Sequence, residues 1–166
     1  MTVLGVDPGR NKVGWALTSL EGDLVSSGIC CLDEQYLFLT ALSQRPARWA
    51  EELSPWVTEK VKTCNSQPEG LSFVAVGNGT GSLEMIKLLE RLGVRIVVVD
   101  ESGTTLEARE LYWSLHAPSW WQRCVPNVMR FPPRPLDDLA AWAIARRSLA
   151  KKRNMALEGS CRCCDQ

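Results

Sequence analysis

The sequence predicts one α/β domain in which a mixed sheet of five strands carries helices on both faces. Near the N-terminus, three strand-like segments follow one another with only turn residues between them, as in an antiparallel meander. Two later apolar segments are separated by segments of helical period, which is typical of parallel strands joined by right-handed crossovers. A chain of 166 residues is long enough for one such domain with one core.

The three strands of the meander are expected at Val3–Val6, Lys12–Ser19 and Leu24–Cys31. In the second of them, apolar residues alternate with others, as in a strand with one buried face. A Pro-Gly pair follows Asp7, and residues 21–23 read Glu-Gly-Asp, so both connections contain turn residues. These three segments therefore predict consecutive antiparallel strands.

Helices and strands alternate in the rest of the domain. From Arg45 to Lys62 apolar residues recur at helical spacing, which predicts one helix or two short ones broken at Pro55. The later elements are a strand, a helix, a strand, a helix and, after a proline-rich loop, a last helix: Leu71–Val76, Ser82–Leu92, Val94–Val99, Thr104–Leu115 and Leu136–Lys152. The domain is thus expected to span residues 1–153, and a Cys-rich tail at 154–166 is expected to be disordered.

Composition and charge do not identify a partner. Nineteen basic residues balance nineteen acidic ones, so any contact with nucleic acid must come from local charge. The N-terminus lacks the basic and apolar regions of a signal peptide, and no segment is long and apolar enough to span a membrane. We therefore expect a cytoplasmic protein without a membrane partner, whose seven cysteines are reduced thiols.

Acidic residues are predicted to gather at one edge of the sheet. Asp7 ends the first strand, the glycine-rich segment Gly77–Gly81 follows the fourth, and Glu101 follows the fifth. Because the carboxyl ends of parallel strands share an edge, these segments should meet there, with Asp137 or Asp138 of the last helix beside them. Clustered carboxylates repel one another unless a cation lies between them, and Mg²⁺ and Mn²⁺ favour oxygen ligands. Two such ions roughly 3.5–4 Å apart can activate water and stabilise the leaving oxygen of a phosphodiester.

Helical phase bears on the choice between the two last acids. Leu139 and Ala143 lie on the predicted buried face, Asp137 borders that face, and Asp138 points nearly the opposite way. We therefore favour Asp137 as the metal ligand, with Asp138 as second choice or as a helix cap. Each acid alone is also typical of a turn or of the first turn of a helix, so only their joint placement indicates a site.

Four stretches, in order along the chain, resemble motifs of the YqgF/RuvC-like nucleases, which have a ribonuclease-H-like fold. The second stretch is similar to the YqgF domain of the Tex proteins, and the fourth resembles the Asp-x-x-Ala-Ala motif of the YqgF group. The stretches are Val6–Ala16, Val76–Glu84, Asp100–Thr105 and Asp137–Ala141. The resemblance covers most of the chain from Val3 to about Leu149 and implies that the mixed sheet is of the ribonuclease-H-like type.

The same resemblance implies a function. It implies an endonuclease dependent on Mg²⁺ or Mn²⁺ that acts on structured DNA or RNA, with Asp7, Glu101 and Asp137 as ligands. The substrate would be a Holliday junction or a ribosomal-RNA precursor, and two symmetric cuts in a junction would require a homodimer. The chain departs from the resolvases in having Gly77-Asn78 where they carry a glutamate after the fourth strand, and Ser102 replaces the usual arginine. A catalytically inactive nucleic-acid- or protein-binding module of the same fold is therefore the alternative.

Basic and aromatic residues are candidates for contact with nucleic acid, because arginine and lysine pair with phosphates and tryptophan stacks on bases. Most lie in the loop before the last helix, and the others lie beside the acidic edge: Trp120, Trp121, Arg123, Arg130, Arg134, Arg10, Lys12 and Asn78. The last helix adds further basic residues. The alternative is that the tryptophans cover the core and that the basic residues of the helix interact with its dipole. A phosphotransferase related to the actin-like ATPases is disfavoured, because the chain is too short for a second lobe.

Overall fold

The computed structural model describes residues 1–34, 37, 39, 56–60, 70–120, 122–126 and 129–161. The strands are β1 (Thr2–Pro8), β2 (Lys12–Ser19), β3 (Leu24–Cys31), β4 (Val57–Lys60), β5 (Leu71–Gly77) and β6 (Ile96–Val99). The helices are α3 (Ser82–Arg91), α4 (Thr104–Leu115) and α5 (Asp137–Cys161), with short 3₁₀ turns η1 (Leu32–Glu34) and η4 (Gln122–Cys124). Among these elements, no helix combines the length and the apolar composition that crossing a bilayer requires.

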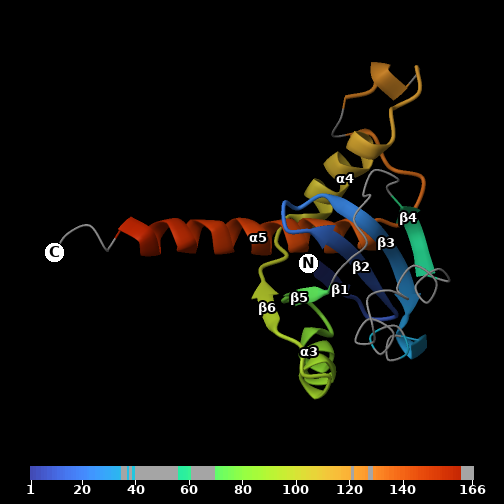
Figure 1. The fold of residues 1–166 in the computed structure, drawn as a ribbon. Helices are drawn as coiled ribbons and strands as arrows, with labels where there is room; N and C mark the ends of the chain where they lie inside the picture. The colour runs from blue at the N-terminus through green and yellow to red at the C-terminus, as the bar shows by residue number, and fades with distance from the viewer. Residues whose placement is uncertain are drawn as a thin grey trace.

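The six strands form one mixed sheet in the order β4-β3-β2-β1-β5-β6 (Figure 1). Strands β1, β2 and β3 form the predicted antiparallel meander, and β5 and β6 are parallel to β1. This order and these directions are the ribonuclease-H-like arrangement that the sequence predicts, so the expected fold class is confirmed.

Strand β4 is the main difference from the predicted elements. The segment from Arg45 to Lys62 was expected to be helical, but Val57–Lys60 forms a strand antiparallel to β3. Its β-branched Val57 and Thr58 suit a strand, and the pairing satisfies backbone groups of β3 that would otherwise be exposed at the sheet edge. The remainder of the predicted helix lies outside the described residues.

Helices cover the sheet on both faces. Leu4, Val6 and Val76 point to the face covered by α3, where they form a core with Met85 and Leu89. The opposite face is covered by α5, which runs across the strands, and α4 packs on α5 (Figure 1). The acidic candidates Asp7, Glu101 and Asp137 lie on the α5 face.

The C-terminal helix is longer than predicted. It was expected to end at Lys152, with a disordered tail from residue 154, but α5 continues to Cys161. Its last part extends away from the sheet (Figure 1), and the final residues 162–166 lie outside the described part of the chain. Among the described residues, Cys30, Cys31 and Cys124 are free thiols.

Candidate functional site

Two glycines bring the start of α5 into contact with the sheet backbone. Gly14 of β2 pairs with Asp7 of β1, and a Cβ atom at Gly14 would collide with the main chain of Asp137. One helix turn further on, a Cβ atom at Gly5 would collide with the carbonyl group of Ala141. Because side chains alternate along a strand, Asp7 points to the same face as Gly5, toward α5. Asp7 and Asp137 are therefore brought together by contact between backbones.

Glu101 reaches the same face from the turn after β6. Its carboxylate lies over β5, because a Cβ atom at Gly77 would be 2.8 Å from its Oε2 and one at Gly79 would overlap its carboxyl group. The side-chain carbonyl oxygen of Asn78 accepts a hydrogen bond from the backbone N–H of Glu101 at 3.1 Å. Glycines at the end of β5 thus provide the space into which the Glu101 side chain fits.

Arg147 holds the other side of this turn. Its guanidinium donates to the backbone carbonyl of Asp100 at 2.7 Å and pairs with Glu107 of α4 at 2.6 Å. Sequence reasoning placed Arg147 only among the basic residues of the last helix and missed this role. The turn that carries Glu101 is therefore supported from β5 by Asn78 and from α5 by Arg147.

The carboxylates of Asp7, Glu101 and Asp137 interact electrostatically. The pKa of Asp7 is raised from 3.8 to about 6, first because burial disfavours the charged form and then because of the negative charges of Glu101 and Asp137. The ammonium of Lys12 opposes this shift and is the weakest of the four influences. Three segments distant in sequence thus concentrate negative charge at the predicted edge of the sheet.

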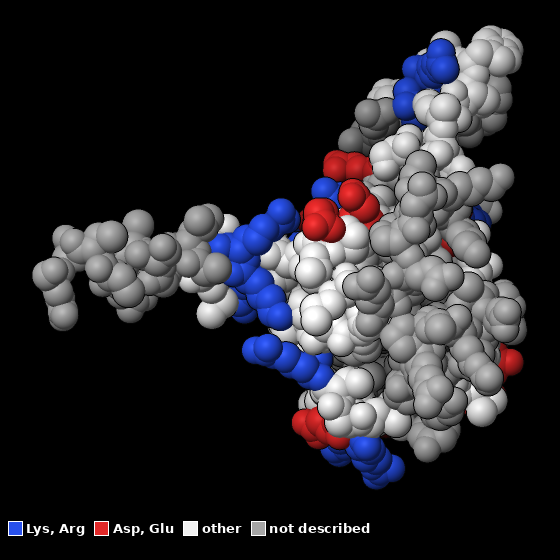
Figure 2. Space-filling model, viewed as in Figure 1, with Lys and Arg blue, Asp and Glu red and all other residues white. Residues whose placement is uncertain are grey.

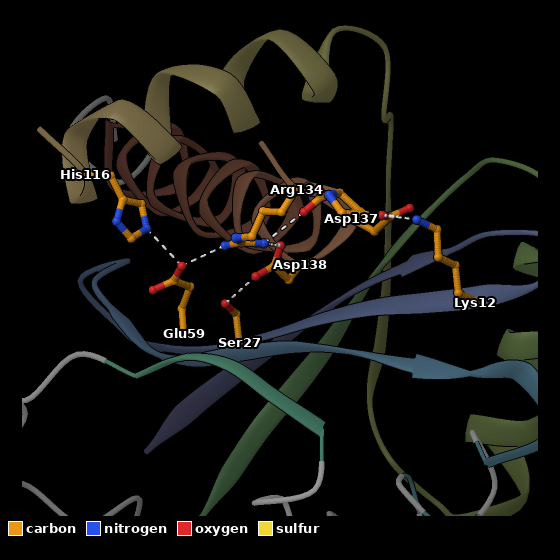
Figure 3. Close-up of polar contacts among 8 residues, drawn as sticks. Lys12, Ser27, Glu59, His116, Arg134, Asp137 and Asp138 are labelled. Carbon is orange, nitrogen blue, oxygen red and sulfur yellow. Dashed lines mark hydrogen bonds and ion pairs between the residues drawn. The ribbon is translucent and has the colours of Figure 1, made fainter. Parts of the chain in front are cut away.

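Lys12, predicted to contact nucleic acid, lies instead against Asp137. Its Nζ is 2.6 Å from Oδ2 of Asp137, and the two side chains are 42% and 27% exposed (Figure 3). Carboxylate oxygens are the donors that Mg²⁺ and Mn²⁺ prefer, so the acidic residues fit such an ion in their chemistry. Among the described residues, however, no three His, Cys, Asp or Glu side chains are gathered as a ready set of metal ligands.

Asp138 is separated from this group. Its side chain has no exposed surface, its Oδ2 accepts a hydrogen bond from Ser27 Oγ of β3 at 3.0 Å, and its Oδ1 pairs with Arg134 at 2.8 Å. Figure 3 shows Asp137 directed toward Lys12 and Asp138 directed toward Ser27. The prediction that Asp138 points away from the buried face was wrong, because the sheet packs on one side of α5 while α4 and the preceding loop pack on the other. Asp138 has a buried structural position, and its predicted catalytic role is not supported.

Arg134 belongs to the same buried polar network. Besides Asp138, its guanidinium pairs with Glu59 of β4 at 2.9 Å, and Glu59 is also 2.9 Å from Nε2 of His116 (Figure 3). Both ends of the guanidinium thus have partners within the fold, which gives Arg134 a structural role, and its contact with nucleic acid stays a prediction. Glu59 and Ser27 were missed by sequence reasoning. Ser27 is brought to α5 by the pairing of β3 with β2, and Glu59 by the pairing of β4 with β3.

The other predicted nucleic-acid contacts lie in two places. Arg10 is exposed and lines a hollow with Asn78 and Gly79–Ser82 at the edge of the acidic site. In the loop before α5, Trp120 is 81% exposed, whereas Arg130 donates hydrogen bonds to the carbonyl groups of Val125 and Arg123. Arg123 itself is exposed, and Trp121 lies outside the described residues.

Basic side chains also gather where α5 leaves the sheet (Figure 2). The exposed ones on this part of α5 are Arg146, Lys151 and Arg153. The balanced net charge therefore includes a locally basic surface, as the sequence predicts.

No family model and no curated protein matches the chain. The structure is similar to RuvC of Thermus thermophilus, with 18% identity, 93% of this chain and 97% of that chain covered, and a TM-score of 0.43. For T. thermophilus RuvC in complex with a Holliday junction substrate, the identity is 17%, the coverage 87% and 90%, and the TM-score 0.42. A ROK family glucokinase from Streptomyces griseus, in complex with glucose and AMPPNP, is 13% identical with a TM-score of 0.38. The match covers 66% of this chain and only 36% of the length of the glucokinase. The chain is thus structurally similar to RuvC at low sequence identity. The fold class itself follows from the strand order and directions described above.

Proposed function

We propose that this protein is a divalent-metal-dependent endonuclease that hydrolyses phosphodiester bonds in structured or branched nucleic acid. One observation carries the proposal: Asp7 is partly buried at this edge, and the negative charges of Glu101 and Asp137 add to the effect of burial, so that the pKa of Asp7 is raised to about 6. Such a concentration of negative charge in a half-buried position is costly for the fold and is typical of a site that binds a cation. The motif resemblance described above supports the same reaction and the same three residues.

Asp7 and Glu101, with Asp137 beside them, would hold Mg²⁺ or Mn²⁺. When bound, the ion supplies activation of a water molecule and stabilisation of the charge on the leaving oxygen. The protein's own contribution is to fix the acids: pairing of β1 with β2 fixes Asp7, Asn78 fixes the turn that carries Glu101, and Gly14 fixes the main chain of Asp137. Acids held by strand pairing and backbone contacts need little rearrangement when a phosphodiester arrives.

Substrate contact would come from Arg10 beside the acidic edge and from Trp120 in the loop before α5. Exposed Arg10 lines the hollow beside the site and can pair with a phosphate, while exposed Trp120 offers a surface for base stacking. Both fit a single-stranded or branched region, where bases are accessible, better than a continuous duplex.

The activity is tested by incubating the full chain with four-way DNA junctions, RNA hairpins and single strands in Mg²⁺ or Mn²⁺. We expect cleavage by the wild type, and at least about a hundredfold loss for Asp7→Asn and Glu101→Gln, since each removes a charge from the site. Glu90→Gln, an exposed charge change on α3, is the matched control and should cleave like the wild type. Equal cleavage by Asp7→Asn and the wild type would rule the mechanism out.

A non-catalytic binding module is the second candidate, and the ion pair of Lys12 with Asp137 favours it. A carboxylate paired with an ammonium at 2.6 Å is less available to a metal ion. Salt-sensitive binding of the same nucleic acids without cleavage in either metal would support this alternative. A homodimer, which paired cuts would require, is tested by measuring the molar mass in solution with and without a junction.

A further inference from the structure

Lys12 is fixed beside the acidic site by the connection between β1 and β2. It is the first residue of β2, and its backbone carbonyl accepts a hydrogen bond from the N–H of Gly9 at 3.0 Å, which closes the turn after Asp7. It lies two residues before Gly14, so it points to the same face as the α5 contact. The hydrogen bond that closes the turn and the start of β2 both fix the backbone of Lys12. Its ammonium is therefore directed toward Asp137 by the fold.

The three acidic residues of the site differ in whether they have an ion-pair partner. Asp7, Glu101 and Asp137 carry three negative charges when ionised, and Lys12 contributes one positive charge. Within the described part of the chain, Asp137 has an ion-pair partner, whereas neither Asp7 nor Glu101 forms a salt bridge. Two negative charges therefore remain to be balanced, which one divalent ion supplies.

The other basic groups near the site are engaged or face elsewhere. Arg147 pairs with Glu107 and the backbone of Asp100, and Arg134 pairs with Glu59 and Asp138. Arg10 faces the hollow on the side of α3. Lys12 is thus the described cation that pairs with Asp137 and whose charge also acts on Asp7.

We propose that Lys12 takes the place of a second metal ion: its ammonium neutralises Asp137, so that the site binds a single divalent ion, held mainly by Asp7 and Glu101. This inference rests on the proposed function and specifies how many ions the same site takes. Lys12 is a positioning residue in this scheme, because it acts through the carboxylate of Asp137. Two ions would place four positive charges beside the ammonium, and the repulsion at such short range disfavours the second ion.

The experiment is a calorimetric titration of the metal-free full chain with Mn²⁺ in the absence of nucleic acid. The wild type should bind one Mn²⁺ per chain. Lys12→Met should bind a second ion, and its first ion should bind roughly tenfold more tightly because the repelling ammonium is gone. Lys12→Arg, which keeps the charge, should return to one ion. Lys87→Met removes an exposed lysine from α3 and should match the wild type.

The outcomes separate the two proposals. Two ions in the wild type, or an unchanged stoichiometry and Kd in Lys12→Met, would overturn the role of Lys12 and leave a metal-dependent nuclease intact. Binding of no Mn²⁺ by any variant would overturn both. Circular dichroism shows whether Lys12→Met folds. If it does not, Lys12→Gln, which keeps a hydrogen-bond donor near Asp137 without the charge, carries the same expectation.

Discussion

The guanidinium of Arg134 lies 2.8 Å from the carboxylate of Asp138, a side chain with no exposed surface. The pair joins the loop before α5 to the first turn of that helix, and Glu59 extends it to β4. Asp137, the neighbour of Asp138, is directed to the other side, toward Lys12. One of the two adjacent acids therefore fixes the helix, while the other is presented at the acidic edge.

Replacing Arg134 should destabilise the fold. Arg134→Met leaves the Asp138 carboxylate buried with only Ser27 as a hydrogen-bond partner, so we expect a loss of about 3 kcal/mol in the free energy of unfolding, measured with urea. Adding Asp138→Asn in the same chain should recover part of this loss, because it removes the unpaired charge. Lys151→Met, at an exposed position on α5, should change stability by less than about 0.5 kcal/mol. A loss in Arg134→Met no larger than that of this control would contradict the structural role.

The raised pKa of Asp7 predicts how stability depends on pH. Because the folded chain binds this proton at a pKa of about 6 and the unfolded chain at 3.8, protonated Asp7 favours the folded state. That stability is complete below about pH 4 and is lost as the pH rises through 6. Asp7→Asn should therefore be about 2 to 3 kcal/mol more stable than the wild type at pH 8 in the absence of metal, and equally stable at pH 4. Urea unfolding at both pH values measures the difference, and a difference independent of pH would count against the shift.

A methyl group at Gly79 should disturb the site without disturbing the fold. Gly79 has an ordinary φ, so Gly79→Ala is conformationally allowed, but its Cβ would take the space of the Glu101 carboxylate. We expect Mn²⁺ to bind at least about tenfold more weakly, because the Glu101 carboxylate is displaced. This change in Kd corresponds to a loss of roughly 1.4 kcal/mol of binding free energy. Gly93→Ala gives the opposite pattern. Its φ of 67° disfavours alanine by about 1 kcal/mol, yet nothing lies within 4 Å of the added Cβ, so Mn²⁺ affinity should stay unchanged. Similar Mn²⁺ affinities in the two variants would exclude the predicted position of Glu101.

Trp120 should contribute to nucleic-acid binding and not to stability. Trp120 is 81% exposed, so Trp120→Ala removes little buried area and should leave stability unchanged. Loss of one stacked base should weaken nucleic-acid binding by about 1–3 kcal/mol, or roughly 5- to 150-fold. Fluorescence anisotropy with a labelled junction and a labelled single strand measures the affinity. Leu106→Ala, an exposed apolar residue on α4, is the control. If both variants bind as the wild type does, the loop before α5 is not the contact surface.

Local sequence patterns were sufficient to predict the sheet and most helices. Alternation in Lys12–Ser19 and the apolar run at Leu71–Val76 each indicate a strand without knowledge of the neighbours. Strand β4 could not be predicted in this way, because its residues also fit a helical period. The deciding factor is the edge of β3, which is far away in sequence and offers Ser27 and its neighbours as pairing partners for β4.

The sequence predicts which acidic residues form the candidate site, but it does not predict which residues contact them. Asp7 and Glu101 follow from the rule that ligands gather at the carboxyl ends of strands, and Asp137 was predicted beside them from the phase of the last helix. The burial of Asp138 does not follow from either, because helical phase assumes one buried face, while residues 138–145 of α5 are all buried. The ion pair of Lys12 with Asp137 depends on the crossing of α5 over β2, which no local pattern encodes.

The contacts at Gly5 and Gly14 have a practical consequence for redesign. With glycine at both positions the main chains of helix and sheet touch, so the spacing between the main chains at Asp7 and Asp137 is set by this contact and leaves no room for adjustment by intervening side chains. Glu101 differs, because it stands on a turn held by the side chains of Asn78 and Arg147. An engineer who wishes to change which cation the protein accepts should therefore vary this turn and leave the two glycines as they are.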